Sequence, residues 1–148
     1  MLHSKIIDLK KEKIEIKKLD NFIYDTKFGA SIIFKGTVRS INENKQVKGI
    51  TYDSHDEMVI KSFEDIYNNI EKELNIKEKA VFIEHVKGYV KLGEISIIIG
   101  VACPHRAEAY ILSRYIIEEI KKKSPIWKKE HYINHESEWL KGNPIITG

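Results

Sequence analysis

One apolar run near the middle of the chain limits the folds open to it. Between Gly93 and Cys103 the apolar residues are almost continuous, at Ile95, Ile97, Ile98, Ile99 and Val101. A strand this apolar is expected to be buried on both faces of its sheet. Pro104 follows, and then a helix expected from about His105 to Lys123, whose apolar residues recur at helical spacing. Its buried stripe is expected to hold Ala109, Leu112, Ser113, Ile116, Ile117 and Ile120.

The remaining chain alternates between strand and helix patterns. A second long helix is expected from Asp56, with Met58 and Phe63 in the core, because its apolar residues lie three and four apart. Between the strands, 10–18 and 40–48 read as polar connections. Strands are expected at 5–9, 29–39, 47–53, 79–90 (a pair, or one strand bent at Gly88), 93–103 and 130–133, and a short helix at 19–24.

Length and composition narrow the class of protein. The 148 residues are expected to form a single domain, 1–148. A net charge of only +3 argues against general binding to nucleic acid. One cysteine, Cys103, excludes an intrachain disulfide and a cysteine-based zinc site, and we expect it to be buried. No apolar run approaches ~18 residues, so we expect a cytoplasmic protein without a membrane span.

Positive charge gathers at both ends of the helix expected from His105 to Lys123. His105 and Arg106 begin it, where a helix dipole disfavours cations, so a bound anion would explain them. Residues 121–131 hold five lysines and one glutamate. The lysines in the last helical turn could simply complement the dipole. Trp127, expected to anchor the segment after Pro125 in the core, would also hold Lys128 still.

Three further residues allow a structural or a functional interpretation. Gly36 interrupts the strand at 29–39, and such glycines often mark a bulge or a close approach by backbone or ligand. Arg39, just beyond it, is either a solvent-facing residue or a fork for phosphate or carboxylate. His85 lies within a strand, where a lone histidine is usually structural.

Three blocks of this sequence together resemble the large, catalytic subunit of molybdopterin synthase. They are Gly29–Arg39 (GASIIFKGTVR), Pro104-His105-Arg106, and Lys121 with Ser124–Glu130 (SPIWKKE). The similarity runs from about Gly29 to Trp139, and the spacing between the blocks also fits. Two stretches depart from the family pattern: His85-Val86-Lys87-Gly88, where His-Arg-x-Gly is usual, and Tyr52–Met58, which contains His55.

The resemblance implies a transferase of molybdenum cofactor biosynthesis with an α+β fold. That fold has a hammerhead-like mixed or antiparallel sheet, two long helices and a small additional β substructure. The family converts cyclic pyranopterin monophosphate to molybdopterin by installing two sulfurs as a dithiolene. Each sulfur arrives as a thiocarboxylate on the Gly-Gly C-terminus of a small ubiquitin-like subunit. The large subunit is a homodimer with one small subunit at each end, a heterotetramer, and needs no cofactor or metal of its own.

The resemblance also assigns roles to individual residues. The family's main catalytic lysine matches Lys121, and an assisting lysine matches Lys128. The pterin pocket, partly built across the dimer, takes in these two lysines with Thr37, Val38, Arg39, His105, Arg106, Lys129 and Glu130. The bare chemistry agrees, because both reactants are anionic and neighbouring lysines lower one another's pKa.

Two other functions are open to the same residues. A non-catalytic module could bind RNA or another polyanion through the lysines of 121–129, although exposed aromatic residues of the kind used by single-strand binders are lacking. A scaffold subunit could dimerise and hold a ubiquitin-like tail without turnover. The presence of both Lys121 and Lys128 argues against a scaffold.

Overall fold

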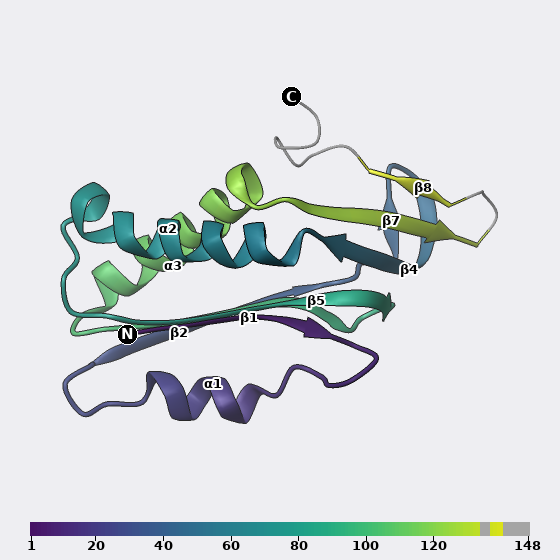
Figure 1. The fold of residues 1–148 in the computed structure, drawn as a ribbon. Coiled ribbons are helices and arrows are strands. Elements are labelled where there is room, and N and C mark those ends of the chain that lie inside the picture. The colour runs from purple at the N-terminus through teal and green to yellow at the C-terminus, as the bar shows by residue number, and fades with distance from the viewer. Residues whose placement is uncertain (134–136, 141–148) are drawn as a thin grey trace.

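The computed structural model describes residues 1–133 and 137–140, which form an eight-stranded sheet with three helices (Figure 1). The sheet order is β2-β6-β5-β4-β7-β8, with β1 beside β5 and β3 beside β4. Only the β1–β5 pair is parallel, so the expected mixed sheet of an α+β fold is confirmed. The elements are β1 Leu2–Asp8, α1 Ile16–Ile23, β2 Ala30–Thr37, β3 Ile41–Asn42, β4 Lys45–Ser54, α2 Asp56–Leu74, β5 Ala80–Lys91, β6 Ile95–Cys103, α3 Arg106–Lys123, β7 Ile126–Tyr132 and β8 Glu138–Trp139.

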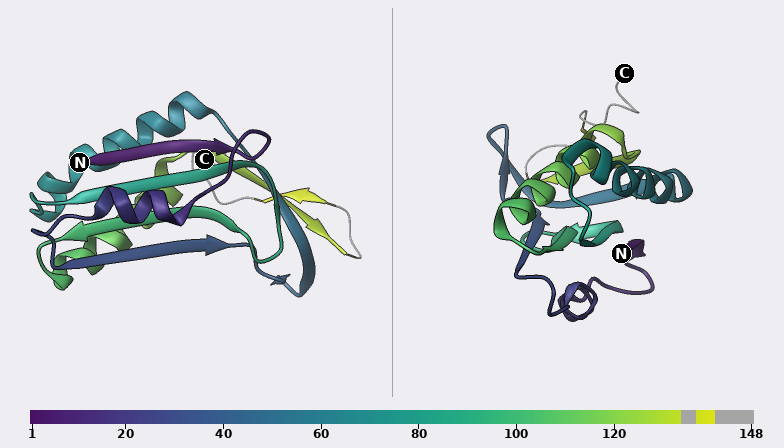
Figure 2. Two further views of the ribbon diagram at one scale, coloured as in Figure 1. Left: turned by 90° about the horizontal axis from the view of Figure 1, so that it is seen from below. Right: turned by 90° about the vertical axis from the view of Figure 1, so that its left-hand side faces the viewer.

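The most apolar strand, β6, is buried on both faces as its sequence predicts. Helices α2 and α3 cover one face of the sheet, and α1 covers the other (Figures 1 and 2). Ile97, Ile99 and Val101 pack in the α2–α3 core, whereas Ile98 and Ala102 pack with α1. The continuous apolar run therefore fills two cores at once. Within the described residues, no helix is long and apolar enough to cross a membrane.

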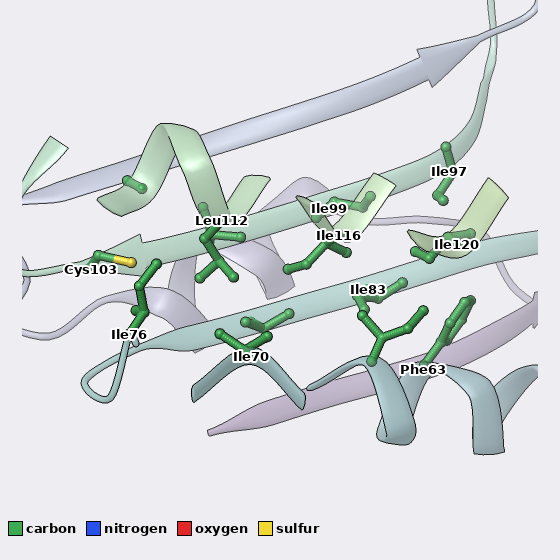
Figure 3. Close-up of a cluster of buried hydrophobic side chains, with 14 of the residues drawn as sticks. Phe63, Ile70, Ile76, Ile83, Ile97, Ile99, Cys103, Leu112, Ile116 and Ile120 are labelled. Atoms are coloured by element: carbon green, nitrogen blue, oxygen red, sulfur yellow. The ribbon is translucent and has the colours of Figure 1, made fainter. Parts of the chain in front are cut away.

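The larger core lies between the sheet and the two long helices (Figure 3). Phe63 and Ile70 of α2 meet Ile116 of α3 and Ile83 of β5 there, and all four side chains are at most 1% exposed. This packing fixes α3 against the sheet, and with it the position of the last helical turn.

Replacing Phe63 with alanine should lower the free energy of unfolding by about 3–5 kcal/mol, because the fully buried ring leaves a cavity that its neighbours only partly fill. Urea denaturation measures the change. Met58→Ala on the same helix is the matched control, because Met58 is 48% exposed and its loss should cost less than about 0.5 kcal/mol. Equal losses in the two variants would contradict this core.

Two expectations about buried side chains were wrong. Met58 is exposed because it lies in the first turn of α2, before the buried stripe begins at Val59. Trp127 is only half-buried and belongs to none of the apolar clusters of the described residues. Alternation along β7 turns the preceding residue, Ile126, toward the core instead.

Strand boundaries differ from those expected at two places. The polar connection at 40–48 contains β3 and the start of β4, joined by a turn in which Glu43 and Asn44 have φ of 49° and 65°. Two successive positive φ values are the mark of the tight turns that join hairpin strands. Strand β7 begins at Ile126 rather than Glu130. Of the two alternatives expected for 79–90, the structure has the single strand, β5, which continues through Gly88 at φ 117°.

Gly36 forms the bulge that its position in a strand indicated. The register of β2 against β6 shifts between Gly36 and Thr37. A Cβ at Gly36 would lie 2.6 Å from Cγ2 of Ile97, so a larger residue at this position would have to displace the Ile97 side chain. The bulge directs the chain from β2 toward Arg39.

Candidate active site

A cavity of about 420 Å³ opens where β2 ends, α3 ends and β7 begins. Five of the nine predicted site residues line it, namely Thr37, Arg39, Lys121, Lys128 and Glu130. Segments more than 80 residues apart in the sequence therefore meet at one place. Other polar residues complete the lining, and sequence reasoning gave them no role there: Asn42, Tyr52, His85 and Ser96.

Local structure explains how the end of the chain supplies its part of the cavity. Helix α3 ends at Ser124, whose backbone N–H donates to the carbonyl of Ile120, and Lys121 lies in the last turn. Pro125 prevents the helix from continuing. In β7, alternating side chains point to opposite faces, so Lys128 and Glu130 face the cavity and Lys129 faces away.

The lysines near the end of α3 do not form one basic surface. Lys122 and Lys123 pair with Glu119 at 3.9 Å and 2.7 Å. Lys128 points into the cavity, while Lys129 lies on the opposite face of β7. A polyanion could not contact all of these ammonium groups together, which weighs against the RNA-binding alternative.

Lys128 has the electrostatics that a proton-transferring lysine needs. Burial lowers its pKa first, and the positive charges of Lys121 and Arg39 lower it further, while Glu130 opposes them. A lowered pKa makes the neutral amine more accessible near pH 7. The sequence predicts that neighbouring lysines lower one another's pKa. Lys121 does lower the pKa of Lys128, although burial is the larger cause.

Glu130 is held in place at the wall of the cavity. Its carboxylate is buried, and one oxygen, Oε1, accepts hydrogen bonds from Asn42 Nδ2 at 2.7 Å and from the Tyr132 hydroxyl at 2.9 Å. Burying a polar group costs free energy unless it is hydrogen-bonded, so these two contacts stabilise Glu130 in its buried position. Asn42 was missed because the hairpin of β3 and β4 that carries it was expected to be a polar connection.

His85 lies deep in the same cavity. It is 6% exposed, and its Nδ1 lies 2.8 Å from the carbonyl oxygen of Val86. The ring of Tyr52 meets it edge-on at 4.9 Å. Burial lowers the pKa of His85 to about 4; the hydrogen bond to Val86 opposes this shift, and the charges of Lys128 and Lys121 add to it. The expectation of a structural histidine agrees with its burial but gave no indication that it lines the cavity.

The lowered pKa of His85 makes the fold sensitive to acid. In the unfolded chain the ring takes up a proton below about pH 6.5, while the folded ring resists until about pH 4. Acid therefore favours unfolding over this range. The gap between the two pKa values corresponds to a loss of about 3 kcal/mol in the free energy of unfolding. In urea denaturation at pH 7 and pH 4.5, His85→Gln should lose less stability on acidification than the parent protein. His105→Gln, at an exposed histidine, should retain the full loss. Equal losses in the parent and His85→Gln would contradict this assignment.

Four predicted site residues do not line the cavity of their own chain. Val38 is buried in the apolar cluster that also holds Ile7, Val47 and Val90. The Nζ of Lys129 lies 5.8 Å from the centre of the Trp139 ring. His105 and Arg106 are exposed at the opposite end of α3. Fifteen residues separate Arg106 from Lys121, or about 22 Å along a helix. Within one chain, Arg106 and Lys121 therefore cannot hold the same substrate group.

The described residues that line the site include no thiol and no group of metal-binding side chains. Burial raises the pKa of the Cys103 thiol to about 11, so the expected inert, buried cysteine is confirmed. Across residues 1–133 and 137–140, no group of three or more His, Cys, Asp or Glu side chains could hold a metal ion. The chemical groups that the cavity offers are amines, a guanidinium, a carboxylate, an amide, hydroxyls and an imidazole.

Comparison with known proteins identifies the family. The sequence model of the MoaE protein family matches residues 9–123. The chain belongs to the MoaE family. It is 35% identical to the molybdopterin synthase catalytic subunit of Synechococcus elongatus over 137 residues, which cover 93% of this chain and 82% of that protein.

Solved structures share the fold of this MoaE chain. The crystal structure of molybdopterin synthase from Staphylococcus aureus superposes with a TM-score of 0.83 at 29% identity, over 92% of this chain and 95% of that one. A complex of subunits 1 and 2 of molybdopterin-converting factor from Helicobacter pylori matches with a TM-score of 0.68 at 23% identity, over 93% and 90% of the two chains. These similarities confirm the α+β fold expected for a MoaE protein.

Proposed function

We propose that this MoaE-family chain is the catalytic subunit of a molybdopterin synthase. It converts cyclic pyranopterin monophosphate to molybdopterin with sulfur from the C-terminal thiocarboxylate of a small ubiquitin-like carrier. The observation that carries the proposal is the convergence of Arg39, Lys121 and Lys128 on one cavity. The 35% identity to a protein named as this catalytic subunit also supports the proposal.

The cavity suits two anionic reactants. The pterin brings a cyclic phosphate and the carrier brings a thiocarboxylate, so both are attracted to a site where three cations converge. Arg39 offers a planar fork for phosphate oxygens. Lys121 is exposed at the rim, where an incoming tail arrives first, and Lys128 lies deeper with a lowered pKa. We assign the main catalytic role to Lys121 and proton transfer in support of it to Lys128.

A homodimer explains why His105 and Arg106 lie far from the cavity of their own chain. If two copies of α3 pack antiparallel about a twofold axis, the first turn of one helix lies beside the last turn of the other. Tyr110 and Ile111 on α3 are 67% and 54% exposed, and they line a shallow groove with Phe34 and Ile117. Phe34, Ile117 and Lys121 also line the cavity, so a partner helix in the groove would reach the site.

The full assembly we propose is a heterotetramer with one carrier at each end of the dimer. The Helicobacter pylori structure named above is a complex of two subunits, which agrees with such an arrangement. The carrier supplies the sulfur, so this subunit requires neither a metal nor a cofactor. We place the enzyme in the cytoplasm, where its carrier and its pterin substrate would be available.

Reconstitution tests the function directly. Purified protein, a thiocarboxylated carrier ending in Gly-Gly and cyclic pyranopterin monophosphate should yield a pterin dithiolene. A carrier with an ordinary C-terminal carboxylate is the matched control and should yield none. Absence of the dithiolene with the thiocarboxylated carrier, at intact Lys121, would overturn the proposal.

A further inference from the structure

The imidazole of His85 has a defined tautomer at the floor of the cavity. The carbonyl oxygen of Val86 can only accept, so the 2.8 Å contact requires a hydrogen on Nδ1 of His85. In the neutral ring, Nε2 is then left as a hydrogen-bond acceptor. The neighbouring Tyr52 ring, edge-on at 4.9 Å, restricts the orientation of the imidazole. His85 is thus an oriented, uncharged acceptor in the cavity lining.

The ring of His85 is uncharged near neutral pH. With a pKa of about 4, only about one ring in a thousand is protonated at pH 7. His85 is therefore too weak a base to remove a proton from a reactant near neutral pH. Its Nε2 can nevertheless accept a hydrogen bond, which does not require protonation.

Charged groups face this ring from several elements. Lys121 at the end of α3 and Lys128 on β7 both act on it electrostatically. Arg39 after β2 and Glu130 on β7 line the same cavity, as does the Tyr52 hydroxyl from β4. The three cationic side chains can only donate hydrogen bonds.

One acceptor in the cavity wall is already in use, because Oε1 of Glu130 accepts from Asn42 and Tyr132. Tyr52 pairs directly with Lys128 across β4 and β7, and its ring contacts that of His85. Nε2 of His85 is an uncharged acceptor in the same cavity as Lys128, whose charge acts on the His85 ring.

Filling the cavity changes which hydrogen-bond acceptors are available to the ammonium group of Lys128. In the open cavity, water can accept hydrogen bonds from its ammonium group. When the carrier tail and pterin displace that water, the same N–H groups must find protein or substrate acceptors. A carboxylate in this place would hold the proton on Lys128 by charge attraction, whereas a neutral nitrogen orients the amine with a smaller effect on its pKa.

We propose that His85 is a positioning residue for sulfur transfer, whose Nε2 accepts a hydrogen bond from Lys128 when the reactants fill the cavity. This inference rests on the proposed function and adds a residue to its site. It also explains why a histidine, rather than an apolar residue of similar size, occupies the buried position next to Tyr52.

Two variants separate this role from simple packing. His85→Gln retains a neutral acceptor, whereas His85→Phe retains a ring of similar size without one. In the reconstituted reaction, His85→Phe should lower kcat about ten- to a hundredfold, with KM for the carrier changed less than about twofold. His85→Gln should recover kcat to within about fivefold of the parent. His131→Gln, at a histidine outside the cavity, is the control. Equal losses in the Gln and Phe variants would overturn the proposal.

Nitrogen-15 NMR of the histidines tests the same contact in the unaltered protein, without turnover. The His85 signals should show a protonated Nδ1 and a bare Nε2. Adding the pterin and a carrier with an ordinary C-terminal carboxylate should move the Nε2 signal toward that of a hydrogen-bonded nitrogen, and Lys128→Ala should abolish the change. An unmoved Nε2 signal in a protein that still transfers sulfur would overturn this role of His85 and leave the proposed function standing. A protein that transfers no sulfur would contradict the proposed function instead.

Discussion

Lys121→Ala should lower the rate of sulfur transfer by about a hundred- to ten-thousandfold, the range expected when a group that transfers protons is removed. The structure places this lysine at the rim of the cavity, in the last turn of α3, beside the buried Lys128. Removing it takes away one exposed ammonium group and leaves the fold of α3 and β7 intact. Binding of the carrier should therefore weaken by less than about tenfold, because a single exposed charge contributes little to affinity. Single-turnover transfer and calorimetric titration of the carrier measure the two effects.

The matched control is Lys122→Ala. Lys122 is the next residue on the same helix, but it pairs with Glu119 and does not line the cavity. Its replacement should leave transfer within about twofold of the parent rate. Loss of carrier binding with unchanged transfer in Lys121→Ala would refute the role given to Lys121. Unchanged turnover with unchanged binding would instead point to another catalytic group.

Arg106→Ala should lower transfer by about a hundredfold, although Arg106 lies about 22 Å from Lys121 in its own chain. In the proposed dimer, Arg106 reaches the cavity of the partner copy and binds the substrate phosphate. The loss should appear mainly as a raised KM for the pterin, because a phosphate contact contributes to binding before the chemical step. Steady-state kinetics with varied pterin concentration measure it.

Arg106→Lys separates charge from geometry at this position. Lysine retains the positive charge but cannot form two parallel hydrogen bonds to a phosphate, so its activity should fall between those of the parent and Arg106→Ala. Both variants should remain dimeric in gel filtration. An Arg106→Ala enzyme with unchanged KM and kcat would show that Arg106 is an ordinary surface residue.

Much of the fold could be predicted because the apolar pattern determines which faces are buried. The run from Ile95 to Val101 predicts burial on both faces, and the structure places α1 on one side and α2 with α3 on the other. The hairpin of β3 and β4 could not be predicted in this way. Its turn residues, Glu43 and Asn44, lack the glycine that commonly marks a tight hairpin turn.

Only some of the site residues could be predicted from the sequence, and the physical reason is not the same for all of them. Charged residues near a proline or glycine, such as Arg39 and Lys128, stand out in a sequence. Neutral residues such as Tyr52 and Ser96 look like ordinary strand residues, because periodicity shows which face a side chain takes but not whether that face borders a cavity. If the strand had been predicted to begin at Ile126, alternation alone would have predicted that Lys129 faces the side opposite to Lys128 and Glu130.

A mixed-dimer experiment tests most directly whether one site is built from both ends of α3. Arg106→Ala and Lys121→Ala proteins, each nearly inactive when the pterin concentration is well below KM, are unfolded together, refolded and assayed at that concentration with the thiocarboxylated carrier. A mixed dimer then has one cavity with its own Lys121 and the partner copy's Arg106, so an equal mixture should regain about a quarter of the parent activity. If each cavity instead used both residues from one chain, every cavity in the mixture would lack one of them. Activity would then stay at the level of the separate variants.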